Sequence, residues 1–148
     1  MGTISSLHTG LNFVLGEIEM SNAGKTILVV DDESDVVEYL TTLFKDQAYR
    51  VITAGTGAEA TQIAMEEHPD LITLDITMPE ESGVRAYRDL RGSEETKDIP
   101  IVIITGYEDP NFRKFIYTRR SAPPPDAYFE KPIDRDKLLE EVKRLLLG

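Results

Sequence analysis

The sequence lacks cysteine, has fewer basic than acidic residues, and contains no long hydrophobic run. Without cysteine, disulfide frameworks and thiolate metal sites are excluded, which fits a reducing compartment. No apolar stretch approaches the roughly 18 residues that a membrane-spanning helix requires. The N-terminus also lacks the basic and apolar regions of a signal peptide. We therefore expect a cytoplasmic protein with no membrane partner.

The charge balance argues against one class of partner. The 148 residues include 27 Asp and Glu against 16 Lys and Arg, for a formal net charge of −11. Such a chain repels phosphate backbones, so direct nucleic-acid binding is not expected. The only candidate for a basic patch comprises Arg113, Lys114, Arg119 and Arg120. A solvated helix face explains that cluster more simply.

The hydrophobic pattern divides the chain near residue 25. Residues 1–24 mix small polar residues with scattered apolar ones and show no clear period, so we treat them as an N-terminal extension of unknown role. Met20 resembles a natural start, which leaves an upstream start or a cloning remnant open for the preceding residues. Residues 25–148 have the length of one ordinary domain.

Apolar, β-branched runs alternate with helical periodicity throughout residues 25–148. The pattern predicts strands over residues 26–30, 49–54, 70–76, 99–105 and 127–132. Helices are predicted between them, including one over residues 111–118, and Ser34, Thr56 and Asp134 are the expected N-caps. This alternation is typical of an α/β fold, with helices on both faces of a five-stranded parallel sheet.

Polar residues follow the predicted strands at matching positions. Asp31 and Asp32 follow the first strand, Asp75 lies at the end of the third, Thr105 ends the fourth and Lys131 follows the fifth-strand sequence AYFE. The carboxyl ends of parallel strands share one edge of the sheet, where ligands of such folds bind. The five side chains are therefore expected to meet in one crevice.

This combination of side chains suits phosphoryl chemistry. Three converging carboxylates resist joint ionisation, and an oxygen-liganded Mg²⁺ would relieve their repulsion. An ammonium and a hydroxyl suit the equatorial oxygens of a phosphoryl group, and Asp75 is the best candidate for a carboxylate nucleophile. Taken singly, Asp-Asp after a strand is often a helix cap and Lys-Pro a turn, but their conjunction favours a functional site.

The segments ILVVDDE, DLITLDITMPEESG, PIVIITG and AYFEKPID resemble the receiver domains of response regulators in two-component signalling. The resemblance covers residues 25–148. It implies the CheY-like fold, which is a doubly wound, flavodoxin-like (βα)5 arrangement with strand order 2-1-3-4-5. It also implies a phosphorylation-dependent signalling switch that is not an enzyme beyond its own Mg²⁺-dependent phosphorylation and dephosphorylation.

The resemblance assigns the metal and phosphoryl ligands by position. Asp75 is the expected phospho-acceptor. Asp32 and Asp75 are the expected direct ligands of Mg²⁺, for which Mn²⁺ could substitute. The backbone carbonyl of Thr77 is the expected third protein ligand, and Asp31 is expected to hold a metal-bound water.

The remaining expected site residues bind the phosphoryl group or respond to it. Lys131 and Thr105 are expected to bind phosphoryl oxygens. Tyr128 is expected to be an aromatic switch that turns inward when Thr105 moves toward the phosphate. The implied phosphodonor is a histidine kinase or a histidine phosphotransfer protein, and the implied receiver of the signal is an unknown downstream protein. Whether the chain acts alone or belongs to a larger protein is left open.

Two alternative functions are considered. An aspartyl-phosphate phosphotransferase or phosphatase usually has a second acid two residues after its nucleophile, but this chain has Thr77 there. A protein-interaction domain that is never phosphorylated has no need of the complete set of acidic, Thr and Lys residues.

The chain departs from the family pattern in two places. The interval from Thr105 to Lys131 is long, with the excess around SAPPPD, which predicts an altered partner surface. Thr77 and Tyr107 occupy positions that tune dephosphorylation in this family, and neither positions an attacking water well, so a long-lived phosphoryl group is predicted. The sequence GTGAEA also matches a dinucleotide-binding pattern weakly, but its glycines are better explained by a tight strand-to-helix turn.

Overall fold

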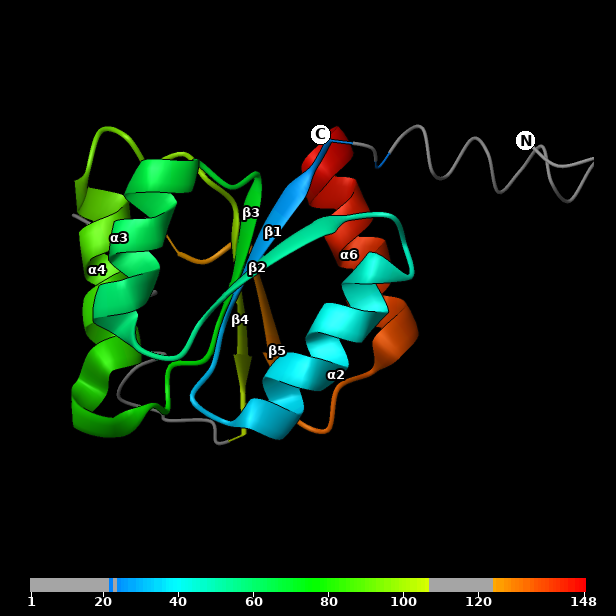
Figure 1. Ribbon diagram of the computed structural model, residues 1–148, viewed down its shortest axis with the longest axis horizontal. Helices are drawn as coiled ribbons and strands as arrows, with labels where there is room; N and C mark the ends of the chain where they lie inside the picture. Colours follow the sequence, from blue (N-terminus) through cyan, green and yellow to red (C-terminus); the bar gives the residue numbers. More distant parts are fainter. Residues whose placement is uncertain (1–21, 23, 107–123) are drawn as a thin grey trace, which may run out of the picture.

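Five parallel strands form one sheet in the computed structural model, which describes residue 22 and residues 24–106 and 124–148 (Figure 1). The strands are β1 (Thr26–Val30), β2 (Arg50–Ala54), β3 (Leu71–Leu74), β4 (Ile101–Thr105) and β5 (Ala127–Glu130). Their order is β2-β1-β3-β4-β5. The predicted fold class and strand order are confirmed, although most of the predicted strands extend a residue or two beyond the observed ones.

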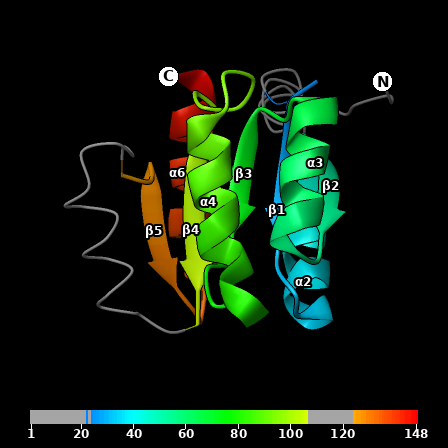
Figure 2. The ribbon, with the colours of Figure 1, turned by 90° about the vertical axis from the view of Figure 1, so that its left-hand side faces the viewer.

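Helices cover both faces of this sheet (Figures 1 and 2). The described helices are α2 (Ser34–Lys45), α3 (Gly57–Glu67), α4 (Ser82–Gly92) and α6 (Arg135–Leu147), with a short 3-10 turn η1 (Pro79–Glu81) before α4. Helices α3 and α4 lie on one face, and α2 and α6 lie on the other. Two helical layers therefore bury the sheet between them.

The packing of strand β1 explains why its sequence is a continuous apolar run. Leu28 and Val30 pack into the core cluster under α3 and α4, whereas Ile27 and Val29 pack into the cluster under α2 and α6. All four side chains are buried. Because both faces of the strand meet helices, the sequence shows no alternation of apolar and polar residues.

Two of the three predicted helix caps are confirmed. The Thr56 hydroxyl accepts the N–H of Glu59 at 3.1 Å, and the Asp134 carboxylate accepts the N–H of Lys137 at 3.2 Å. The Ser34 prediction was wrong, because Ser34 is already the first residue of α2 and Glu33 stands at the cap position with no side-chain cap bond.

The glycines of GTGAEA lie in the tight strand-to-helix turn that was predicted, since only Gly55 and Thr56 separate β2 from α3. Neither Gly55 nor Gly57 has the left-handed backbone that a glycine-requiring turn would need. Instead, a Cβ atom at Gly57 would lie 2.1 Å from the carbonyl oxygen of Ser82 in α4. The glycine at position 57 is therefore needed for the close approach of α3 to α4.

Several predictions concern residues that the structure does not describe. The helix over residues 111–118, the basic cluster and Tyr107 lie outside the described residues, as does nearly all of residues 1–24. The proposed division at residue 25 and the altered partner surface therefore stay predictions.

Candidate functional site

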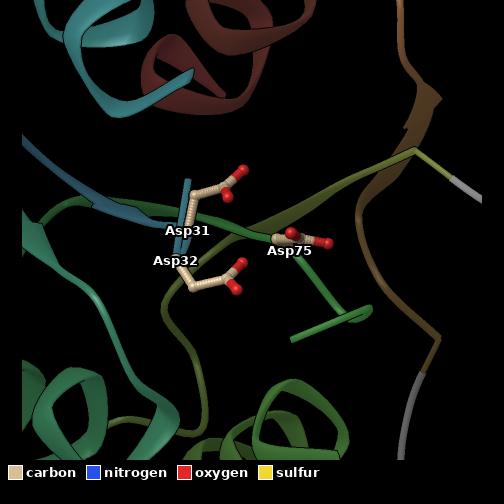
Figure 3. Close-up of side chains that lie close together, drawn as sticks. All are labelled: Asp31, Asp32 and Asp75. Carbon is tan, nitrogen blue, oxygen red and sulfur yellow. The ribbon is translucent and has the colours of Figure 1, made fainter. Parts of the chain in front are cut away.

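The three acidic residues lie together at the carboxyl edge of the sheet. Val30 and Leu74, the last residues of β1 and β3, are paired in register, so Asp31, Asp32 and Asp75 leave neighbouring strands at the same level. One carboxylate oxygen from each of the three lies within 4.8 Å of the others. Figure 3 shows the three side chains close together. The predicted convergence of the carboxylates is therefore observed.

The three carboxylates differ in their exposure. Asp31 and Asp75 are each 2% exposed, whereas Asp32 is exposed. Asp32 also lines a cleft of about 520 Å³ between the first turns of α3 and α4. Two acidic groups are thus buried in the protein, and the third opens the site to solvent.

Lys131 brings positive charge to this acidic cluster. It follows β5, and its Nζ lies 2.9 Å from Asp31 Oδ2 and 3.6 Å from Asp75 Oδ2. The Glu33 carboxylate is a further partner at 3.2 Å. Sequence reasoning did not include Glu33, although its place directly after Asp31 and Asp32 was a signal for it. The Lys131 ammonium thus contacts three carboxylates at once.

Thr105 and Thr77 lie on the other side of Asp75. The buried Thr105 hydroxyl donates to the Thr77 hydroxyl over a long 3.4 Å contact. The Thr77 hydroxyl donates to Asp75 Oδ1 at 2.7 Å, and the Thr77 N–H donates to the same oxygen at 2.9 Å. The resemblance implied a role for the Thr77 carbonyl, but it gave no sign that the Thr77 side chain binds Asp75.

Tyr128 occupies a strand position rather than a place among the carboxylates. It is partly buried, and it packs against the core cluster on the α3–α4 face of the sheet. Its register partner in β4 is Ile103, two residues before Thr105. This placement puts it on the strand that borders Thr105, and its predicted switch role stays a prediction.

The electrostatics reflect an excess of negative charge. Burial raises the pKa of Asp31, and the nearby Asp75 carboxylate adds to this rise, against the lowering effects of the Glu33 N–H and Lys131. Burial acts to lower the pKa of Lys131, but its hydrogen bond to Asp31 and the charges of Asp75 and Asp31 outweigh burial and raise it. Lys131 therefore remains charged, whereas the negative charges of Asp31 and Asp75 repel each other.

The donor set fits a hard divalent cation. The cluster offers only carboxylate oxygens, which are the ligands that Mg²⁺ and Ca²⁺ prefer. Two of the three are buried close together with like charge, so a cation would relieve their repulsion. The exposed Asp32 leaves room for the several waters that Mg²⁺ usually keeps. The residues present are thus able to bind such a metal.

Fold and site together define a doubly wound α/β domain with an acidic pocket at the carboxyl ends of its strands. The family model of the response regulator receiver domain matches residues 27–143. The chain belongs to this family. Membership confirms the resemblance, and receiver domains are typically not enzymes beyond the chemistry of their own phosphorylation, as the resemblance implied.

Comparisons with individual proteins agree with this assignment. The chain is 33% identical to Protein PilH of Pseudomonas aeruginosa over 122 residues, which cover 82% of this chain and 98% of PilH. It is 34% identical over 126 residues to the CAI-1 autoinducer sensor kinase/phosphatase CqsS of Vibrio cholerae, covering 84% of this chain but only 18% of CqsS. Similar domains thus occur both alone and within longer proteins.

A solved structure supports the interpretation of the acidic pocket. The receiver domain of the sensor histidine kinase PA1611 from Pseudomonas aeruginosa has a magnesium ion coordinated in its active site cleft. It is 25% identical to this chain, with a TM-score of 0.74, and the match covers 85% of this chain and all of that one.

Among the residues described here, no helix is both long enough and apolar enough to cross a bilayer.

Proposed function

We propose that this chain is a phosphorylation-dependent signalling switch whose phospho-acceptor is Asp75. The observation that carries this proposal is the position of the Asp75 carboxylate. It is buried, it lies within 4.8 Å of two further acidic ligands, and Lys131 Nζ is 3.6 Å from its Oδ2. A carboxylate with a cation site and an ammonium beside it is suited to accept a phosphoryl group.

The metal proposed for this site is Mg²⁺, with Mn²⁺ as a substitute. Asp32 and Asp75 would hold it directly together with the Thr77 carbonyl, and Asp31 would hold one of its waters. When bound, the metal supplies positive charge against the phosphoryl oxygens during transfer. The coordinated magnesium of the PA1611 receiver supports this choice by similarity.

The other site residues are proposed to bind and report the phosphoryl group. The Lys131 ammonium would bind one phosphoryl oxygen, because it is already held at the carboxylate edge by Asp31. The Thr105 hydroxyl would bind another, since it ends β4 beside Thr77. Movement of Thr105 together with Tyr128 would then alter the surface around β5 that a downstream protein contacts.

A receiver domain implies a histidine kinase as its partner. We propose that this kinase, or a histidine phosphotransfer protein, donates the phosphoryl group to Asp75. In that transfer the Asp75 carboxylate attacks phosphorus, the bond from phosphorus to the donor histidine nitrogen breaks, and the nitrogen takes up a proton. The long phosphoryl lifetime expected from Thr77 and Tyr107 stays a prediction.

The proposal is tested by intact mass after incubation with Mg²⁺ and acetyl phosphate. We expect the wild-type chain to gain the mass of one phosphoryl group, in an adduct that hydroxylamine removes. Asp75→Asn should gain none, and a chelator should abolish the gain in wild type. Asp89→Asn, which removes an exposed carboxylate from α4, is the matched control and should behave as wild type.

Two outcomes would contradict the proposal. An adduct of equal yield on Asp75→Asn would place the acceptor at another residue. No adduct on wild type, with either acetyl phosphate or a set of histidine kinases as donors, would favour an interaction domain that is not phosphorylated.

A further inference from the structure

The Thr77 side chain donates a hydrogen bond to the Asp75 carboxylate, and the proposed function gives this bond no role. Asp75 Oδ1 accepts the Thr77 hydroxyl at 2.7 Å and the Thr77 N–H at 2.9 Å. A carboxylate offers about four acceptor sites over its two oxygens, so one residue fills both sites of Oδ1. The other oxygen, Oδ2, faces Lys131.

The two donors of Thr77 differ in how easily they can leave. The N–H belongs to the backbone between β3 and η1, and it moves only with that loop. The hydroxyl turns about a single side-chain bond, and Thr77 is exposed, so solvent can take over its hydrogen bond. The hydroxyl is therefore the displaceable partner of Asp75.

A divalent cation and this hydroxyl compete for the same carboxylate. A cation on Oδ1 requires a lone pair that the hydroxyl now occupies. A cation on Oδ2 binds a carboxylate whose negative charge is already partly satisfied by the hydroxyl. In both arrangements the hydrogen bond from Thr77 opposes metal binding at Asp75.

Thr105 connects this competition to the proposed switch. Its hydroxyl donates to the Thr77 hydroxyl at 3.4 Å, and a hydroxyl that accepts a hydrogen bond becomes a stronger donor itself. The contact is long, so its contribution is smaller than that of the 2.7 Å bond from Thr77 to Asp75. Release of Thr77 from Asp75 would therefore also change the surroundings of Thr105.

We propose that the Thr77 hydroxyl is a latch on Asp75, meaning a hydrogen bond that opposes divalent metal binding at this carboxylate, and that Thr77 thereby lowers the metal affinity of the site. The inference rests on the proposed function, because it takes Asp75 to be a metal ligand. Thr77 is a positioning residue here, which acts through the Asp75 carboxylate.

The test is a Mg²⁺ titration followed by the backbone amide resonances of residues 74–77, without any phosphodonor. Thr77→Val removes the hydroxyl and keeps the branched shape. We expect its Mg²⁺ dissociation constant to fall about three- to tenfold, the scale of one net hydrogen bond. Thr77→Ser keeps the hydroxyl and should bind as wild type does. Thr105→Val should tighten binding by less than Thr77→Val.

A matched control removes a hydroxyl that does not touch Asp75. Thr53→Val makes the same change at an exposed position in β2, and its affinity should equal that of wild type. Unchanged or weaker Mg²⁺ binding in Thr77→Val would overturn the latch and leave the phosphorylation proposal standing. If wild type itself bound no Mg²⁺, or if Asp75→Asn bound it as well as wild type does, the proposed metal site would fail and the latch with it.

Discussion

At the scale of single residues, the acidic side chains that the structure describes at the site carry more negative charge than the Lys131 ammonium beside them can balance. Lys131 Nζ lies within 4 Å of carboxylate oxygens from Asp31, Glu33 and Asp75. Glu33 is largely solvated, but Asp31 and Asp75 are not. Burial and the neighbouring carboxylate therefore raise the pKa of Asp31, which means that its ionised form is less stable in the folded chain than in the unfolded chain.

We predict that Asp31→Asn stabilises the metal-free protein at neutral pH. The pKa of Asp31 is higher in the folded chain, so the protonated carboxyl favours folding. This contribution to stability is fully present below the usual pKa of 3.8, and it is lost as the pH rises through the pKa of the folded chain. Thermal unfolding in the presence of a chelator should show a higher melting temperature for Asp31→Asn at pH 7. The gain should shrink as the pH falls toward 3.8.

The exposed Asp89→Asn is the control for this experiment, and its melting temperature should stay close to wild type at both pH values. A lower melting temperature for Asp31→Asn at pH 7 would show that the hydrogen bonds of Asp31 to Lys131 and Glu33 outweigh the cost of burying its charge.

At the scale of secondary structure, two glycines allow α4 to reach the positions that form the site. A Cβ at Gly57 would lie 2.1 Å from the Ser82 carbonyl oxygen, and a Cβ at Gly83 would lie 2.3 Å from the Asp75 carbonyl oxygen. The first contact sets the distance between α3 and α4. The second packs the first turn of α4 against the residue that carries the proposed phosphoryl group, so helix packing and site geometry depend on each other.

We predict that Gly57→Ala destabilises the fold by about 2 kcal/mol or more, because the added methyl group overlaps backbone atoms that cannot turn away. Gly92→Ala is the matched control at the end of α4, where a Cβ meets nothing within 4 Å. It should be neutral or stabilise by up to about 1 kcal/mol. Urea unfolding measures both, and equal stabilities for the two variants would refute the close-packing explanation.

At the scale of the whole molecule, one arginine joins parts that are far apart in the sequence. The Arg91 side chain is only 5% exposed. It donates to the carbonyl oxygens of Lys97 and Ile99 at 3.1 and 2.7 Å, and to Asp126 Oδ2 at 2.9 Å. Asp126 Oδ2 also accepts the N–H of Ile101 at 2.8 Å. Arg91 thus ties α4 to the beginnings of β4 and β5, at the end of the sheet opposite the acidic site.

We predict that Arg91→Ala lowers the free energy of unfolding by about 2–4 kcal/mol, because it leaves two carbonyls and a carboxylate without their buried donor. Arg144→Ala breaks the solvent-exposed pair with Glu141 on α6 and should cost much less than Arg91→Ala. Urea unfolding of both variants is the measurement. A cost for Arg91→Ala as small as that for Arg144→Ala would show that the hydrogen bonds of Arg91 contribute little.

The sequence by itself determined the five-stranded α/β architecture and five of the residues that meet in the site. Its apolar runs are buried on both faces, so their period identifies parallel strands, and the residue after each strand must lie at the carboxyl edge. The order of strands and polar residues along the chain was therefore enough to group Asp31, Asp32, Asp75, Thr105 and Lys131. The helix caps at Thr56 and Asp134 are local features, since each bond spans only three residues, and they too were predictable.

The tertiary structure alone decided which atoms meet within the site and between the two helices that pack beside it. Side-chain rotamers decide that the Thr77 hydroxyl binds Asp75 and that the Glu33 carboxylate contacts Lys131. The close packing of α3 on α4 decides that Gly57 contacts Ser82. No periodicity encodes these distances, because the partners belong to separate elements or depend on a single torsion angle. The same amino acids explain both levels, but a pattern along the chain specifies an edge of the sheet and its local helix caps, whereas only packing in three dimensions specifies the contacts between separate elements.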